Sequence, residues 1–151
     1  MSDELQAWDR DFIELAFREA KKSFDEGGLP IGSVLARGGE LIASGHNQRV
    51  QHGDPIAHGE MDCLRKAGRQ QSYRGMTIYT SLSPCMMCAG TIVQFKIPRV
   101  VINDTVNFGG NEVFLRERGV KVVDVADPAS IDLMRRFIDS NPELWNEDIM
   151  E

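Results

Sequence analysis

Long apolar runs are missing from this sequence. A helix that crosses a membrane needs about 20 consecutive apolar residues, and no segment approaches that length. The first residues, Met1 to Glu4, are acidic, whereas a secretory signal peptide begins with basic and then apolar residues. Internal repeats, low-complexity segments and linkers are absent too. We therefore expect a soluble cytoplasmic protein with one domain over residues 1–151, since 42% hydrophobic residues in a chain of 151 suffice for one core.

Cysteine is scarce as well, with three residues in the whole chain. An odd number, two of which form a C-x-x-C pair at Cys85 and Cys88, argues against a disulfide framework and for metal or redox chemistry. The remaining cysteine, Cys63, is expected to be a small buried apolar residue.

Positive charge is in deficit, because 17 Lys and Arg face 23 Asp and Glu, for a net charge of −6. Sequence-independent binding to nucleic acid relies on clustered Lys and Arg, so the deficit disfavours a nucleic-acid partner and favours a small uncharged substrate. The short basic run of Arg65, Lys66 and Arg69 is interpreted as a solvated helix end whose charges complement the helix dipole.

Hydrophobic periodicity predicts a mixture of helices and strands. Apolar residues at helical spacing from Trp8 to Phe24, before Gly27-Gly28, indicate an opening amphipathic helix. Gly38-Gly39 is typical of the turn of an antiparallel hairpin. We expect strands over 31–36, 41–44, 77–82, 100–102 and 120–125, a polar loop over 48–53, and further helices over 54–67, 86–95, 112–118 and 131–138, the last taken as the final helix. This order predicts an α/β fold, a three-layer α/β/α sandwich with a central mixed five-stranded sheet.

Two short motifs carry the chemistry, His58-Gly59-Glu60 and, about two dozen residues later, Pro84-Cys85-Met86-Met87-Cys88. A neutral imidazole and two thiolates leave the fourth tetrahedral position of a zinc ion open for water, as catalytic zinc sites require. The combined pattern, H-x-E and P-C-x-x-C, is the signature of zinc nucleobase deaminases, in which the glutamate is a proton carrier and not a ligand.

The spacing of His58 and Glu60 imposes a condition on the backbone. Residues two apart in a helix point about 200° away from each other, so both side chains face one metal only where the chain enters the helix. Gly59 permits a close backbone approach there, and we expect an irregular first turn. An open zinc site lowers the pKa of water from 15.7 to about 7. The motif thus predicts a zinc-activated hydroxide, with Glu60 as the shuttle that protonates the ring nitrogen and the departing amine.

Other interpretations of the motifs remain open at this point. A structural zinc site needs a fourth ligand, for which His46, His52 and Cys63 are candidates. A dithiol redox pair, or a non-catalytic zinc or thiol module, gives His58 and Glu60 no task.

The helix expected from Met86 to Phe95 has almost no charged face, so it must be buried nearly all round. The sheet covers one side, and we expect a second copy of the chain to cover the other, which makes the protein a homodimer. The alternative is that neighbouring helices cover it.

Further segments support a family resemblance: Gly28 to Gly32, Gly45-His46-Asn47, Thr80 to Cys85, Val106-Asn107-Phe108, and a tail from Phe137 to Ile149. With these the chain resembles the cytidine deaminase-like superfamily and, within it, the small fungal-type zinc cytosine deaminases, which act on the free base. The tail is the discriminating part, since the wider superfamily shares the zinc motif but not this ending.

The resemblance assigns a role to each site residue. It implies zinc as the cofactor, Glu60 as the catalytic residue, a homodimer, and a closed lid with no room for ribose. The remaining roles are zinc ligands for His58, Cys85 and Cys88; contacts to the pyrimidine carbonyl and ring N–H for Asn47 and the Gly59 amide; contacts to the exocyclic amine for Asp148 and the Ser83 carbonyl; and the lid for Phe108, Trp145 and Ile149. Without the resemblance, Asn47 also suits a turn, the two aromatic residues an ordinary core, and Asp148 a solvated tail.

The function that follows is hydrolytic deamination of cytosine to uracil and ammonia. The alternatives are another free base or amino-heterocycle, such as guanine or isocytosine, and then a tRNA adenosine deaminase. The chain departs from the fungal pattern at Met86, at Asn146 and in the loop Gly109-Gly110-Asn111. These departures bear on the identity of the base rather than on the reaction.

Overall fold

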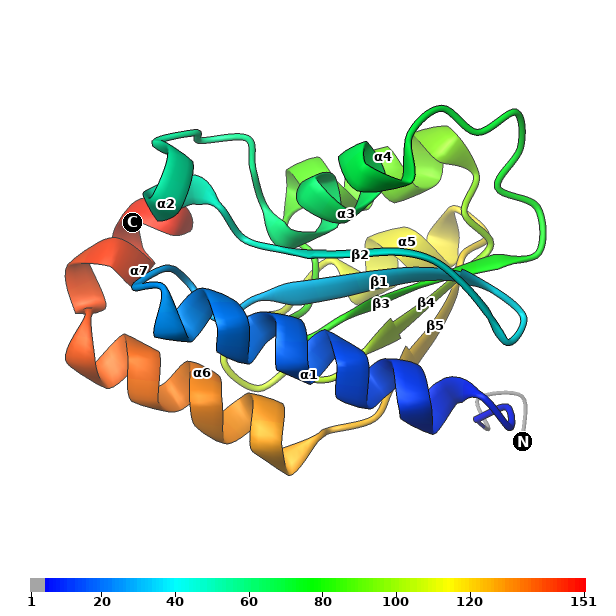
Figure 1. Cartoon of the computed structure of the whole chain (residues 1–151). Coiled ribbons are helices and arrows are strands. Elements are labelled where there is room, and N and C mark those ends of the chain that lie inside the picture. Colours follow the sequence, from blue (N-terminus) through cyan, green and yellow to red (C-terminus); the bar gives the residue numbers. More distant parts are fainter. Residues whose placement is uncertain (1–4) are drawn as a thin grey trace.

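A five-stranded mixed sheet forms the centre of the molecule in the computed structural model of the chain, which describes residues 5–151 (Figure 1). The acidic start, Met1 to Glu4, lies outside the described residues. The strand order is β2-β1-β3-β4-β5; β1 is antiparallel to β2 and β3, whereas β3, β4 and β5 are parallel. The strands are β1 (Gly32–Arg37), β2 (Glu40–His46), β3 (Met76–Thr80), β4 (Arg99–Ile102) and β5 (Lys121–Asp124).

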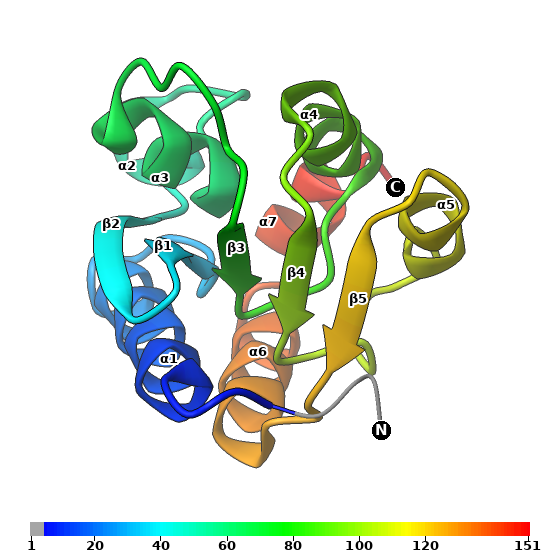
Figure 2. The ribbon, with the colours of Figure 1, turned by 90° about the vertical axis from the view of Figure 1, so that its right-hand side faces the viewer.

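Helices cover both faces of this sheet. One face carries α1 and α6, and the other carries α3, α4 and α5, as the two ribbon views show (Figures 1 and 2). The three-layer α/β/α architecture expected from the sequence is confirmed. The helices are α1 (Asp9–Asp25), α2 (Arg49–His52), α3 (Gly59–Ala67), α4 (Met86–Phe95), α5 (Glu112–Glu117), α6 (Pro128–Ser140) and α7 (Pro142–Asp148).

The alternation of strand side chains divides the core in two. Successive residues of a strand point to opposite faces, so Val34 packs under α1 while Leu35 packs under α3. The same alternation holds for Val100 and Val101, which are both fully buried. Both faces of the sheet are therefore apolar, which is why the strands read as nearly continuous hydrophobic runs.

A third apolar cluster closes the edge of the sheet where the functional residues lie. Because β1 and β3 are antiparallel, the start of β1 lies beside the end of β3, with Ser33 paired to Thr80. The residues just outside these strands pack against α6 and α7 in a cluster of Leu29, Ile31, Leu82, Met134, Phe137 and Trp145. The two C-terminal helices thereby lie over this edge.

Most strand and helix ends are shifted by a few residues from the sequence expectation, and three differences are larger. The helix expected over 54–67 begins at Gly59, because the Asp54 carboxylate accepts the Ile56 N–H at 2.9 Å and holds a separate turn. The expected loop 48–53 contains the short helix α2, which ends at Gly53 with φ of 62°. The helix expected to be final is followed by α7, since Pro142 lacks the N–H that continuing α6 would require and starts a new helix instead.

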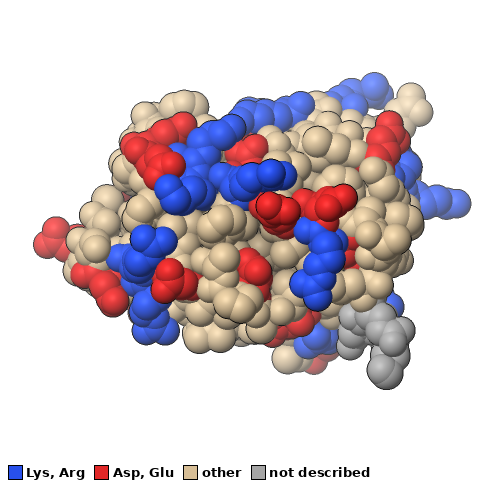
Figure 3. Space-filling view, turned by 60° about the horizontal axis from the view of Figure 1, so that its bottom comes forward, with Lys and Arg blue, Asp and Glu red and all other residues tan. Residues whose placement is uncertain are grey.

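The outer surface mixes charges of both signs. Figure 3 shows Lys and Arg interspersed with Asp and Glu on the side of α1 and α6, and spaced pairs such as Lys21–Asp25 and Arg136–Asp132 account for part of this pattern. The predicted solvated run is confirmed, because Arg65, Lys66 and Arg69 are exposed. None of the helices within residues 5–151 combines the length and apolar character needed to cross a membrane.

The helix α4 is covered on one side only. Cys88, Ala89 and Ile92 face the core, but Met86 and Phe95 are 56% and 39% exposed. Neighbouring helices of the same chain therefore do not cover its outer face. In the single chain α4 is thus buried on one side, and the burial of its outer face by a second copy stays a prediction.

Candidate metal centre and active site

The three expected metal ligands converge at the starts of two helices. The Nδ1 atom of His58 lies 3.5 Å from the Cys85 sulfur and 3.8 Å from the Cys88 sulfur. Zinc bonds of about 2.0 Å to nitrogen and 2.3 Å to sulfur in a tetrahedron place such atoms about 3.6 Å apart. The observed spacing therefore suits a zinc ion without rearrangement of the backbone.

Backbone conformation explains how a contiguous motif reaches one point. His58 and Cys85 each occupy the N-cap position in an extended conformation, with ψ of 163° and 176°. Cys88 lies one turn into α4. The expected irregular first turn is not seen: α3 is helical from Gly59, and His58 reaches the site because it lies just outside the helix in an extended conformation. Pro84 precedes this N-cap residue, and α4 begins at Met86 as expected.

Gly59 is required by the packing of α3 against the start of β1. A Cβ atom on Gly59 would lie 2.9 Å from the Ile31 carbonyl oxygen, closer than real Cβ contacts allow. The close backbone approach expected from the sequence is thus confirmed. It brings the His58 and Glu60 side chains into the same cavity.

The fourth metal position is left free by the protein. Within residues 5–151 the ligand group has three members, His58, Cys85 and Cys88. His46 is engaged elsewhere, with Nε2 at 3.1 Å from Glu26 and Nδ1 at 3.1 Å from the Gln48 amide. The Cys63 thiol is buried and lies 3.5 Å from the Ala43 carbonyl, and burial raises its pKa. The structural-zinc interpretation therefore lacks its fourth ligand, and the set is that of a catalytic site.

The pKa values of Cys85 and His58 are shifted in opposite directions. A hydrogen bond from the Cys88 thiol is the main cause that lowers the pKa of Cys85 to about 4. Burial opposes the charged form of His58, but the bond to the Cys85 sulfur and the charge of Asp148 outweigh it and raise its pKa to about 9. A thiolate is thus available to a metal, and binding to His58 displaces a proton.

Glu60 is a buried carboxyl beside the triad. Burial is the main cause that raises its pKa, which brings a carboxyl nearer to the range suited to proton transfer. The hydroxyl of Thr80, at the end of β3, donates to Glu60 Oε2 at 3.1 Å. The side chain is therefore held in one orientation without a permanent ionic partner.

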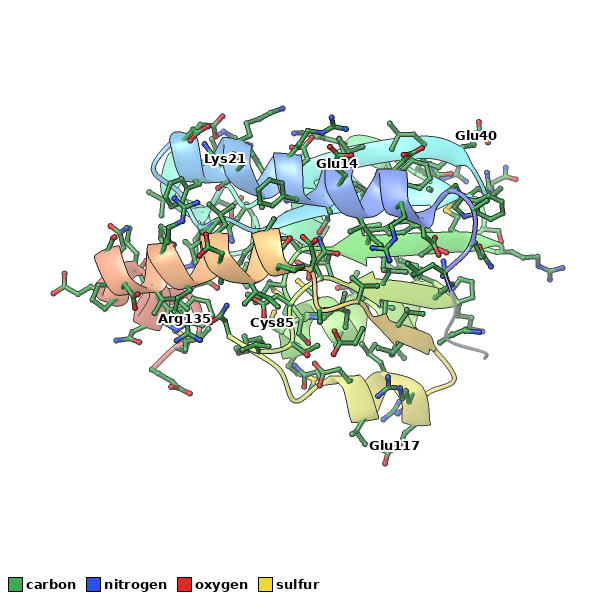
Figure 4. The ribbon with its side chains drawn as sticks, turned by 90° about the horizontal axis from the view of Figure 1, so that it is seen from below. Glu14, Lys21, Glu40, Cys85, Glu117 and Arg135 are labelled. Atoms are coloured by element: carbon green, nitrogen blue, oxygen red, sulfur yellow. The ribbon has the colours of Figure 1, made fainter. Side chains whose placement is uncertain are left out.

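A small cavity adjoins the triad at the edge of the sheet. Figure 4 shows Cys85 in the interior of the molecule, whereas Glu14, Lys21 and Glu117 project outward. Apolar walls and a few polar groups of this kind are typical of sites for small molecules. The residues that line the cavity are Ile31, His58, Glu60, Leu82, Ser83, Cys85, Phe108, Asp148 and Ile149.

Two buried polar groups near this cavity have unused hydrogen-bonding capacity. Asn47 is fully buried; its Oδ1 accepts the Arg49 N–H at 2.8 Å, while its Nδ2 has no partner. Asp148 Oδ1 has no hydrogen-bond partner either, and it lies 4.0 Å from His58 Nε2. The two groups lie close to each other: burial raises the pKa of Asp148, and its contact with the Asn47 side chain opposes that rise. A buried donor and a buried acceptor without full hydrogen bonds are costly, and a ligand that pairs with both removes that cost.

The aromatic residues divide between the cavity wall and its support. Phe108 and Ile149 line the cavity, whereas Trp145 lies behind Phe108, edge to face at 6.1 Å between ring centres. Trp145 also belongs to the third apolar cluster. Trp145 thus packs as a core residue, and it supports the cavity wall by its contact with Phe108.

Sequence reasoning missed three residues that support the site. Thr80 holds Glu60, Arg49 contacts Asn47 and α7, and Glu112 accepts a hydrogen bond from the Ser83 hydroxyl. Thr80 belongs to the segment Thr80 to Cys85, which supports the family resemblance, so its place in the sequence could have pointed to a role in the site. Arg49 and Glu112 had none, since each meets its partner only through the tertiary fold.

Comparison with known proteins identifies the family. Residues 6–104 match the cytidine and deoxycytidylate deaminase zinc-binding region. The chain belongs to this family, and the triad of His58, Cys85 and Cys88 is its zinc-binding site.

Relatives extend the likeness over the whole chain. A cytosine deaminase of Candida albicans is 47% identical over 146 residues, which are 95% of this chain and 97% of the relative. A tRNA-specific adenosine deaminase of Bacillus subtilis is 42% identical over 93 residues, 60% of this chain and 58% of the relative. The second likeness thus covers a smaller share of both chains than the first.

Solved structures share the architecture. A tRNA:A34 deaminase superposes with a TM-score of 0.72 at 29% identity, covering 82% of this chain and 99% of the other. The guanine deaminase from Nitrosomonas europaea superposes with a TM-score of 0.76 at 21% identity, covering 89% of this chain and 86% of the other. The latter likeness shows the fold alone.

Proposed function

We propose that this chain, as one zinc-dependent deaminase domain, hydrolyses the free base cytosine to uracil and ammonia. The observation that carries the proposal is a three-ligand zinc site beside the buried Glu60, in a cavity flanked by the unpaired groups of Asn47 and Asp148. The likeness to the Candida albicans cytosine deaminase, which includes the C-terminal helices, supports cytosine as the base. A cytoplasmic location is part of the same proposal.

Glu60 performs the proton transfers in this reaction. Zinc in the triad supplies the Lewis acidity that allows a water molecule to lose a proton near neutral pH. The Glu60 carboxylate accepts that proton and passes it to the ring nitrogen. It then accepts the remaining proton of the added hydroxyl, as the carbonyl forms, and gives it to the amine, which leaves as ammonia. Burial favours the neutral form after each uptake, and the Thr80 hydroxyl keeps Glu60 Oε2 oriented through the cycle.

Hydrogen bonds to the base edge select the substrate. The Asn47 amide nitrogen is the free donor, because its oxygen is already bonded, so it suits the carbonyl of a pyrimidine. The Gly59 N–H and the Ser83 carbonyl complete the edge, and Asp148 accepts from the exocyclic amine. A base with the wrong pattern leaves these buried groups unpaired, which discriminates strongly. Phe108, Trp145 and Ile149 form the lid, with Trp145 as its support.

A different free base, such as guanine or isocytosine, is the second candidate. Met86 is 56% exposed at the start of α4, and Asn146 follows the lid residue Trp145, so two departures from the fungal pattern adjoin the site. A tRNA adenosine is a weaker candidate, because the likeness to the tRNA deaminase of Bacillus subtilis covers 60% of this chain, against 95% for the Candida albicans cytosine deaminase.

A homodimer is part of the proposal as well. The outer face of α4, with Met86, Met87 and Phe95, is exposed, and Ile56 lies exposed nearby in a groove that also contains Phe95. An apolar patch of this kind is typical of an interface. Sedimentation should give a particle of twice the 16.9 kDa chain, and a monomer would refute the dimer.

One experiment tests the activity. The purified protein is incubated with cytosine, cytidine, guanine, adenine and isocytosine, and ammonia release is measured beside the zinc content. Cytosine should react and cytidine should not. Glu60→Ala should lose about 10²- to 10⁴-fold in turnover and keep its zinc. Turnover of another base with cytosine untouched would refute the substrate, and an inert protein would leave only a zinc-binding module.

A further inference from the structure

Arg49 touches both polar walls of the candidate substrate site. Its backbone N–H donates to Asn47 Oδ1 at 2.8 Å, so the Asn47 amide nitrogen is the atom left without a partner. Its guanidinium reaches α7, where Nη1 bonds to Glu147 and Nε lies 4.0 Å from Asp148 Oδ1. Figure 1 shows α2 and α7 side by side at one end of the molecule, although 98 residues separate Arg49 from Glu147.

The burial of Arg49 suits it to hold a helix in place. Its side chain is 10% exposed, whereas that of Glu147 is 57% exposed. A guanidinium bound mainly by protein contacts is more ordered than a surface lysine, and its planar fork fixes the direction of the partner carboxylate. The bond to Glu147 therefore restrains α7 from the solvent side, while the apolar residues of α7 restrain it from below.

Because the Arg49 guanidinium bonds to Glu147, the Asp148 carboxylate remains available to the substrate. Glu147 takes the direct bond, and Asp148 stays beyond hydrogen-bond distance of the Arg49 guanidinium, with Oδ1 unpaired. A direct bond to Asp148 would compete with the exocyclic amine of the base. At 4.0 Å the positive charge does not occupy the carboxylate; burial raises the pKa of Asp148, and the Arg49 charge opposes part of that rise.

We propose that Arg49 is a positioning residue that holds α7, and with it Asp148 and Trp145, closed over the substrate cavity. The inference rests on the proposed function, because it assigns Arg49 a task in the binding of a base. Loss of the guanidinium loosens α7, so the base binds less tightly and product leaves sooner.

Two variants test the guanidinium and its partner. Arg49→Met keeps the length of the side chain, and Glu147→Gln changes an exposed residue outside the cavity. With cytosine as the probe, Arg49→Met should raise KM about tenfold with kcat unchanged or higher, and Glu147→Gln should raise it about threefold. Arg49→Lys should fall between wild type and Arg49→Met, because it keeps the charge and loses the fork. The double variant should be no worse than Arg49→Met alone.

Trp145 gives a second readout that needs no substrate. In a Trp8→Phe background Trp145 is the remaining tryptophan, and its fluorescence should become more accessible to acrylamide in both Arg49→Met and Glu147→Gln. The matched control is Asp132→Asn, which breaks the 3.1 Å pair with Arg136 on α6, outside the site. It should leave KM and quenching unchanged.

The outcomes separate this inference from the proposed function. Unchanged KM and unchanged quenching in Arg49→Met and Glu147→Gln would overturn the role of Arg49, as would a fall in thermal stability with no other change. If Arg49→Met does not fold, Glu147→Gln decides. If wild type leaves cytosine untouched, the proposed function fails, and the quenching of Trp145 still decides whether Arg49 holds α7.

Discussion

Two buried polar clusters in this molecule differ in how completely their hydrogen bonds are satisfied. Under α1, the Asp9 carboxylate accepts from both Arg99 nitrogens at 2.6 and 3.0 Å, from the Tyr79 hydroxyl and from the Gln6 N–H. Near the metal ligands, by contrast, Asn47 just after β2 and Asp148 at the end of α7 keep unpaired atoms.

The difference teaches what each cluster does. We call Asp9, Tyr79 and Arg99 the closed cluster. Loss of one partner of a paired buried charge is strongly destabilising, so this cluster matters for stability. Its polar atoms are already hydrogen-bonded to each other and are not available to a ligand. The open cluster, Asn47 and Asp148 with the triad, holds groups that only a substrate completes. We expect variants in the first to change the free energy of unfolding, and variants in the second to change the reaction.

The largest effect is expected in the open cluster. His58→Ala should abolish zinc binding and lower turnover at least about 10⁴-fold, because the acidified water is lost with the metal. Chelation of wild type should do the same, and added zinc should restore it. Metal analysis beside ammonia release measures both. A His58→Ala protein that keeps both zinc and activity would remove the triad from the mechanism.

The next effect tests the closed cluster. Asp9→Asn should lower the free energy of unfolding by about 3–5 kcal/mol, because it leaves the Arg99 charge buried without a partner. Activity of the folded fraction should not change. Urea denaturation beside kcat measures the two. A stable Asp9→Asn protein with lost activity would reverse the comparison between the clusters.

A smaller effect is expected where one unpaired group is neutralised. Asp148→Asn should lower kcat/KM about 10- to 100-fold, since a charged acceptor for the exocyclic amine is lost. The free energy of unfolding should change little, because Asp148 Oδ1 has no hydrogen bond to lose. Thermal melts and steady-state rates check this. Destabilisation comparable to that of Asp9→Asn would show that Asp148 is structural.

The smallest expected effect is on the pH dependence of the free energy of unfolding. Burial alone would raise the pKa of Asp9, but hydrogen bonds from Arg99 and Tyr79 outweigh it and lower that pKa. The stabilisation is present above the unfolded-state pKa of about 3.9 and is lost as pH falls through the lowered folded-state value. The difference in unfolding free energy between wild type and Asp9→Asn should therefore narrow below about pH 4. Urea titrations at pH 7 and pH 3 compare them.

Regular elements with strong periodicity were predictable, and short polar ones were not. The α1 helix and the hairpin around Gly38-Gly39 follow the sequence expectation because their apolar spacing is unambiguous. The four-residue helix α2 has no buried residue, so it left no hydrophobic pattern to detect. The late start of α3 escaped prediction because Asp54 makes a turn with the same residue type that caps helices.

The residues of the candidate site also fall into those that the sequence predicted and those that it did not. His58, Glu60, Cys85 and Cys88 lie within two short motifs, whose spacing allows only a few geometries. The support from Arg49 and the position of Trp145 behind Phe108 depend on segments that are distant in the sequence.

The sequence by itself determined the chemistry of this protein: three zinc ligands and one proton carrier, because local backbone geometry at two helix starts brings contiguous residues together. Only the tertiary structure decided which polar atoms of the site already have a hydrogen-bond partner and which do not. The Asn47 oxygen is bonded and its nitrogen is not, and Glu147 rather than Asp148 takes the Arg49 bond. The physical reason is that hydrogen-bond satisfaction depends on partners that folding supplies from far along the chain.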